Sequence, residues 1–216
     1  SFGMIDETVP SYSKKSSYNI NQNGINTSLS YNLNDWVNLK YGINGILYNT
    51  QPGKVEPYGS ESLIYPKELE PEKAFEGAVF INNEQNITKW LSVLYGVRYS
   101  GIGNFGPKTF FDYMPGVSKS VNSLRDTMFY GQNELIKLYK GLEPRILLRI
   151  KTGSNSSFKL SYNKTRQYIN LIFNTISAAP TDIWKLSDFY FKPMEGEQYS
   201  IGYYQDFVNR YRDNFS

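Results

Sequence analysis

The sequence predicts an all-β fold, a transmembrane antiparallel up-and-down β-barrel of which this chain forms a part. Seven segments alternate between apolar and polar side chains with a period of two residues, as a strand with one apolar and one polar face does. The connections between them are alternately short and long, and outer-membrane barrels have short periplasmic turns and long extracellular loops. The sequence also has no run of about 18 apolar residues, so it predicts crossing of a bilayer by strands alone.

The first two strands are predicted at about 22–33 and 36–49, joined by the short turn Asn34-Asp35. In the segment 25–33 every odd position is apolar or β-branched, and every even position is Asn or Ser. The second strand repeats this order on its apolar side with Val37, Leu39, Tyr41 and Ile43. Each strand therefore has one face suited to lipid and one suited to water.

The third and fourth strands are predicted at about 75–86 and 90–101, with a short connection at 87–89. The third is the least regular of the seven. In the fourth, mainly small or polar residues separate the apolar positions Leu91, Val93, Tyr95, Val97 and Tyr99. This pair of strands therefore continues the same two-faced pattern.

The last three strands are predicted at about 142–152, 156–168 and 196–207, and a Gly-Ser-Asn turn at 153–155 joins the first two of them. Their apolar positions alternate with Arg, Lys, Ser, Asn or Gly for most of their length. These positions are Ile146, Leu148, Ile150, Phe158, Leu160, Tyr162, Tyr199, Ile201 and Tyr203.

The long connections are predicted at about 50–74, 102–141 and 169–195. We expect residues 1–20 to be the end of an earlier long loop and 208–216 to lead into an eighth strand. The loosely helical order of apolar residues at 124–139 predicts a short helix. Since the smallest bacterial membrane barrels have eight strands, residues 1–216 are expected to be one part of a single larger barrel domain.

Composition excludes several classes of chemistry. The chain has neither His nor Cys, so it offers no Ser-His-Asp triad, no cysteine nucleophile and no conventional zinc site. We therefore expect no enzymatic activity, no cofactor and no metal. The formal net charge is only +3 and the basic residues are dispersed, so we expect no nucleic-acid partner.

Aromatic residues at the predicted strand ends indicate contact with the membrane interface. Trp36 and Trp90 directly follow short turns, where a periplasmic aromatic girdle would lie, and Tyr18, Tyr48 and Tyr99 would lie near the outer rim. The alternative is the ordinary preference of aromatic residues for strands.

The long loops are rich in aromatic residues beside Asp, Asn and Gln, a combination that binds sugars or peptides by stacking and hydrogen bonding. The alternative is that these aromatics form a small core for the loops themselves. The candidate ligand-binding residues are Phe110, Phe111, Tyr113, Tyr130, Asp182 and Trp184.

Short motifs follow one another in a fixed order between about residues 65 and 207. They are AVFINNE (78–84), LSVLYGVRYS (91–100), LEPR (142–145), FKLSYNKTRQY (158–168), APTDIW (179–184) and KP with EQYSIGY (192–193 and 197–203). This series resembles the TonB-dependent outer-membrane receptors, specifically their carboxypeptidase-regulatory-like, SusC-related branch.

The resemblance implies a 22-stranded barrel in the outer membrane that imports a large ligand, an oligosaccharide or a peptide, in a TonB-dependent manner. It also implies a plug domain, which is not present in this chain, contact with the TonB complex through that plug, and a SusD-like surface lipoprotein as a lid. Outer-membrane lipid would surround the barrel. The alternative is a non-transporting outer-membrane or secreted β-rich surface protein that binds a partner through its aromatic loops.

Overall fold

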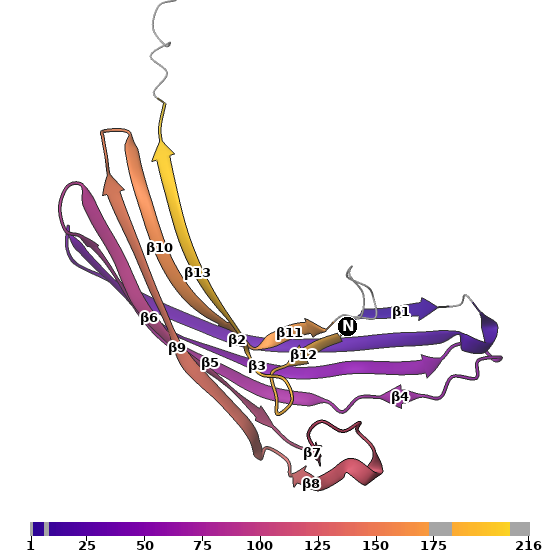
Figure 1. Ribbon diagram of the computed structural model, residues 1–216. Helices are drawn as coiled ribbons and strands as arrows, with labels where there is room; N and C mark the ends of the chain where they lie inside the picture. The colour runs from indigo at the N-terminus through magenta and orange to yellow at the C-terminus, as the bar shows by residue number, and fades with distance from the viewer. Residues whose placement is uncertain (1, 7–8, 173–182, 208–216) are drawn as a thin grey trace, which may run out of the picture.

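The computed structural model describes residues 2–6, 9–172 and 183–207, which form an all-β, antiparallel fold dominated by one large, bent sheet (Figure 1). Two small hairpins and two 3-10 turns lie in its connections. The sheet has the order β1 (Phe2–Asp6), β2 (Lys14–Asn34), β3 (Val37–Pro57), β5 (Glu72–Asn86), β6 (Leu91–Phe105), β9 (Leu135–Lys151), β10 (Ser156–Gln167) and β13 (Met194–Gln205), with β4 (Lys67–Glu68) paired to β3.

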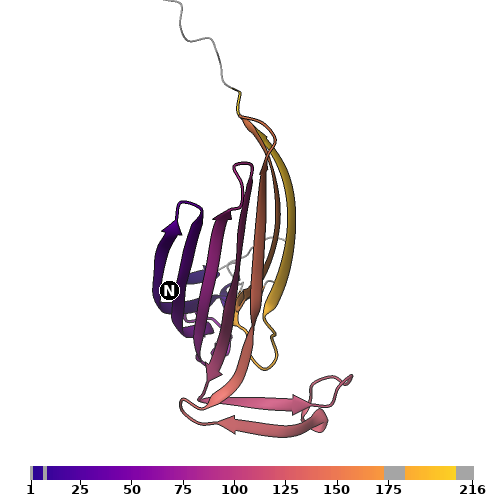
Figure 2. The same cartoon turned by 90° about the vertical axis from the view of Figure 1, so that its left-hand side faces the viewer.

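All seven predicted strands are confirmed, as β2, β3, β5, β6, β9, β10 and β13. Each of them pairs in antiparallel fashion with the next in this series, so they form an up-and-down sheet. The short connections lie at one end of the sheet and the long connections at the other, which confirms the predicted alternation (Figures 1 and 2). We call these the turn end and the loop end.

Two expectations about the connections were wrong. Part of the segment 1–20 forms β1 and the start of β2, which pair with each other, instead of an irregular loop. The segment 124–139 contains β8 (Leu124–Tyr130) and the start of β9 instead of a helix. Its alternating side chains pair with neighbouring strands, and that pairing overrides the weak helical pattern. The eighth strand expected at 208–216 lies outside the described residues.

Two hairpins form within the long connections. The hairpin of β7 (Lys108–Tyr113) and β8 projects from the loop end of the sheet, and the 3-10 turn η2 (Val121–Ser123) lies in its connection (Figure 2). The hairpin of β11 (Ile169–Ile172) and β12 (Ile183–Leu186) lies over the concave side of the sheet (Figure 1). The other 3-10 turn, η1 (Pro10–Tyr12), precedes β2.

The register divides the sheet into two faces, because directly paired residues of antiparallel strands point to the same side. One such row joins Leu29, Tyr41, Ile81 and Val97, and we call its side the outer face. The next row along the sheet joins Ser30, Lys40, Asn82, Gly96 and Arg145, and we call its side the inner face.

Burial is the reverse of what a sheet in water shows. The inner face is covered at the loop end by the β11–β12 hairpin, and the buried core lies between them; its members are Tyr48, Ala74, Ile102, Tyr168 and Leu186. The outer face has no such cover among the described residues: Leu29 is 59% exposed and Ile201 is 75% exposed. At the loop end the sheet therefore buries its mixed, partly charged face, while its apolar face has no cover along its length among the described residues.

Candidate functional site

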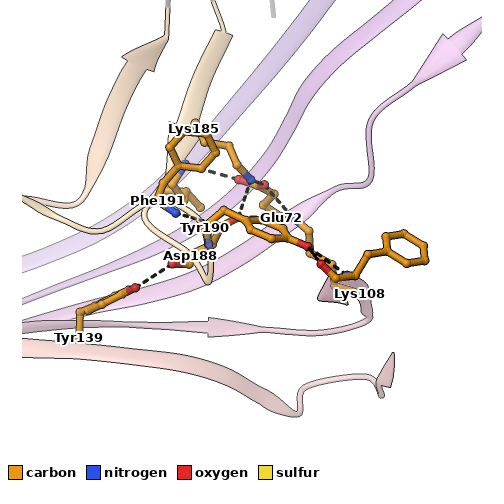
Figure 3. A network of polar contacts seen from close by, with 9 residues as sticks. Glu72, Lys108, Tyr139, Lys185, Asp188, Tyr190 and Phe191 are labelled. Atoms are coloured by element: carbon orange, nitrogen blue, oxygen red, sulfur yellow. Dashed lines mark hydrogen bonds and ion pairs between the residues drawn. The ribbon is translucent and has the colours of Figure 1, made fainter. Parts of the chain in front are cut away.

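The most developed polar site lies where the inner face meets both hairpins at the loop end. It consists of Glu72 at the start of β5, Lys108 at the start of β7, Lys185 in β12 and Asp188 just after β12 (Figure 3). The side chains of the two acids are 5% and 3% exposed. We call these four residues the ion cluster.

Opposite charges are matched within the ion cluster. The Lys108 ammonium lies 2.8 Å from a Glu72 carboxylate oxygen and 3.9 Å from an Asp188 oxygen. The Lys185 ammonium lies 2.7 Å from Asp188 and also contacts Glu72. Two carboxylates and two ammonium groups thus compensate for their removal from water, which an unpaired charge could not do.

The electrostatic environment keeps Lys185 charged. Burial alone would lower the pKa of Lys185, but the charges and hydrogen bonds of Glu72 and Asp188 outweigh burial and raise the pKa above its ordinary value. The backbone N–H of Leu186 also donates to Glu72, at 3.4 Å. The cluster therefore joins the start of β5 to the β11–β12 hairpin through both side chains and backbone.

Asp188 also fixes the chain that follows β12. Its other carboxylate oxygen accepts hydrogen bonds from the backbone N–H groups of Tyr190, at 2.8 Å, and Phe191, at 3.0 Å. The Tyr139 hydroxyl donates to the Asp188 carbonyl oxygen at 3.0 Å (Figure 3). A single residue thus connects the ion cluster, a tight turn and β9.

A second polar network crosses the inner face nearer the middle of the sheet. Arg98 lies between two carboxylates, 3.7 Å from Glu76 and 3.6 Å from Glu143. The Tyr48 hydroxyl donates to Glu76 at 2.9 Å. Tyr48 therefore lies on the inner face, and the expectation that it belongs to the outer-rim aromatics was wrong.

The same network reaches the β11–β12 hairpin through Ser100. The Ser100 hydroxyl donates to Glu143 and lies 2.7 Å from the hydroxyl oxygen of Tyr168, the residue that precedes β11. The backbone N–H of Ser187, just after β12, donates to the Tyr168 carbonyl oxygen at 2.7 Å. The hairpin is thus closed at its base and attached to the inner face through Tyr168.

The predicted aromatic residues divide into a buried and an exposed group. Phe110 is 1% exposed, and its ring contacts Tyr130, Phe189 and Tyr190 at centroid distances of 6.0, 5.7 and 5.3 Å. It occupies the centre of a small loop core. Tyr130 is half-buried beside it. In this conformation Phe110 offers no surface for stacking against a ligand.

Phe111 and Tyr113 lie on the accessible side of the β7–β8 hairpin. Phe111 is exposed, Tyr113 is half-buried, and their ring centroids are 6.4 Å apart. The Lys119 ammonium lies over both Tyr113 and Tyr190, 5.7 and 5.2 Å from the ring centroids. These rings form an aromatic surface bordered by a cation, which suits stacking against a ligand.

The remaining predicted residues lie elsewhere. Trp184 is half-buried in β12, and among the described residues no ring contact joins it to the β7–β8 aromatics. Asp182 lies outside the described residues. Trp36 and Trp90 are exposed at the turn end, and Tyr99 is exposed on the outer face toward the loop end. Their role at a membrane interface stays a prediction.

The sequence indicated neither the pairing within the ion cluster nor the hydrogen bonds that Tyr139 and Tyr168 form at the inner face. One signal was available for the second network: the alternation already placed Glu76, Arg98 and Glu143 on the polar sides of three strands. No comparable local signal marks Glu72 and Lys185, which are 113 residues apart.

Comparisons with known proteins leave the chain unassigned: no family model, no curated protein and no solved structure matches it. In the described part of the chain, no helix has the length and apolar character needed to cross a membrane. Among the same residues, no group of three or more acidic side chains is placed to hold a metal ion.

Proposed function

We propose that this chain is part of the β-barrel of a TonB-dependent, SusC-like outer-membrane receptor that imports an oligosaccharide or a peptide. The observation that carries the proposal is the reversed burial of the sheet. In water, exposing the whole apolar face would cost about 25 cal/mol per Å². Acyl chains of outer-membrane lipid remove that cost, whereas water in a lumen solvates the inner face.

The dimensions of the apolar face support a membrane position. On β3 the outer-face positions run from Val37 to Leu47, ten residue steps. At about 3.3 Å per step and a strand tilt of about 40°, this stretch covers about 25 Å along the membrane normal, the height of the apolar band of bacterial barrels.

The edges of the sheet support a larger barrel. Among the described residues, β13 pairs only with β10, and the part of β2 after Tyr18 pairs only with β3. Unpaired backbone groups in lipid cost several kcal/mol each, so additional strands must close the sheet. A total of 22 strands, the plug domain and contact with TonB are inferred from the motif series.

The loop end supports a role in ligand capture at the cell surface. Both hairpins, the ion cluster and the accessible rings of Phe111 and Tyr113 lie at this end, opposite the short turns. In a barrel with periplasmic short turns, these groups face the cell exterior, where a SusD-like lipoprotein would retain the ligand.

Ligand uptake by cells whose own gene for this protein has been deleted tests the proposal. The complete polypeptide that contains this chain is expressed with and without functional TonB, and uptake of labelled oligosaccharides and peptides is measured. Uptake of one ligand class that requires both the polypeptide and TonB is expected. Binding at the surface without TonB-dependent uptake would favour the non-transporting alternative, and recovery in the soluble fraction would refute the membrane assignment.

A further inference from the structure

The inner face has a second region, at the turn end, where charge is not matched. Its basic side chains come from three strands: Lys40 in β3, Arg145, Arg149 and Lys151 in β9, and Lys159 in β10. The register places one acidic side chain, Glu84, among them. We call these five basic residues the basic row.

At the loop end of the inner face, in contrast, each basic side chain of the two polar networks has acidic partners. There, Arg98, Lys108 and Lys185 each contact two carboxylates. No residue of the basic row forms an ion pair with any described residue. The β11–β12 hairpin covers the loop half of the inner face and leaves the turn half open.

The arrangement places like charges side by side. Lys159 lies directly opposite Arg149 across the β9–β10 ladder, and like charges in directly opposed positions destabilise a sheet. The Lys159 ammonium instead lies 4.1 Å from the centroid of the Tyr204 ring.

We propose that the basic row is a docking surface for an acidic polypeptide segment that enters the concave side of the sheet from the turn end. The inference rests on the proposed function, in which the inner face lines a lumen. Lipid head groups would meet the outer face or the rims, not this surface. The basic side chains lie on three of the five strands from β3 to β10, with Asn82 and Gly96 between Lys40 and Arg145, so a segment with several carboxylates matches them better than a single small anion.

Photo-crosslinking in the complete polypeptide, kept in native outer membranes, tests this inference. A photoreactive residue replaces Ser161, which lies on the inner face one row from both Arg145 and Arg149, and Leu160 on the outer face provides the matched position. Ser161 is expected to crosslink to a peptide rich in Asp and Glu, and Leu160 to lipid. Crosslinking from Ser161 to a neutral or basic peptide, to a polysaccharide, or to nothing would overturn the inference.

The Leu160 position separates the two proposals. If Leu160 captures no lipid, the proposed membrane barrel fails; if Leu160 captures lipid and Ser161 captures no acidic peptide, only the docking surface fails. The double substitution Arg149→Glu/Lys159→Glu is then expected to reduce the Ser161 crosslink at least about tenfold. Loss of close charge pairs at an interface costs about 1.4 kcal/mol or more, and about 1.4 kcal/mol corresponds to a factor of ten. Lys67→Glu, which changes an exposed lysine in β4 at the loop end, is the control and should leave the crosslink unchanged.

Crosslinking of the wild-type sequence at high salt is a further test, and it does not depend on whether the charge-reversal variant assembles. In about 1 M salt the Debye length falls to about 3 Å, so the crosslink of the wild-type sequence at Ser161 should weaken if charge attraction holds the segment. A crosslink that is insensitive both to salt and to charge reversal would refute charge complementarity.

Discussion

Removal of Glu72 should release the β11–β12 hairpin from the inner face. Glu72 contacts both lysines of the ion cluster and accepts a hydrogen bond from the Leu186 backbone. In Glu72→Ala, two largely buried ammonium groups would share Asp188 alone. Breaking a buried ion pair by removing one partner costs about 3 to 5 kcal/mol, and we expect the local free energy of hairpin opening to fall by this amount.

Amide hydrogen exchange of Ser187 measures this loss. Its N–H donates to the Tyr168 carbonyl oxygen at 2.7 Å and makes no direct contact with Glu72. Tyr168 is held to the sheet by Ser100, so protection of this N–H reports whether the β12 side of the hairpin base stays closed against the anchored β11 side. At tenfold per 1.4 kcal/mol, the exchange rate should rise about a hundredfold to several thousandfold. The matched control is Glu56→Ala, which removes a surface ion pair with Lys54 worth at most about 1 kcal/mol. Unchanged Ser187 protection in Glu72→Ala would refute the role of the ion cluster.

Three further predictions concern packing, close contacts and pH. Phe110→Ala should destabilise the loop core by about 3 to 5 kcal/mol, measured by protease cleavage of the β7–β8 hairpin. Phe111→Ala, the control, should leave cleavage unchanged and lower ligand affinity. Equal cleavage of both variants would contradict the difference in burial between Phe110 and Phe111. Gly96→Ala should impair assembly, measured by heat-dependent gel mobility, because a Cβ there would lie 2.6 Å from the Ile81 carbonyl oxygen, while Ser30→Ala should assemble normally; normal assembly of both would contradict that close contact. The pKa of Lys185 is raised in the folded state, so the stabilising contribution of its charge is complete below the ordinary pKa of 10.5 and is lost as the pH rises through the pKa of the folded state. Protection of the Ser187 N–H should therefore stay constant between neutral pH and pH 9. A decline in protection over this range would contradict the raised pKa.

The strands were predictable because their signal is local. A period of two in apolar and polar residues determines which side of each strand a residue occupies, and the register of β2 against β3 preserves that assignment from 19 to 32. Short turns such as Asn34-Asp35 have their own residue preferences. The direction of each strand and the grouping of long loops at one end then follow from the order of connections.

The structure of the loops was not predictable from local patterns. Phe110 and Phe111 are neighbours in the sequence, and alternation within β7 places one in the loop core and the other in solvent. Which of the two faces inward depends on Tyr190, which bonds with its hydroxyl to both backbone groups of Phe111 from 79 residues away. Tyr48 illustrates the same limit, since its burial depends on the distant hairpin that covers it.

Accessibility along one strand pair tests the assignment of the outer face to lipid most directly. Because the chain contains no Cys, single Cys residues introduced at Leu29, Tyr41, Ser30 and Lys40 can carry a spin label without competition within this chain. In the complete polypeptide in lipid bilayers, labels at Leu29 and Tyr41 should collide preferentially with oxygen, which concentrates in lipid, and labels at Ser30 and Lys40 with a water-soluble nickel chelate. The same preference for the chelate at all four positions would contradict the account.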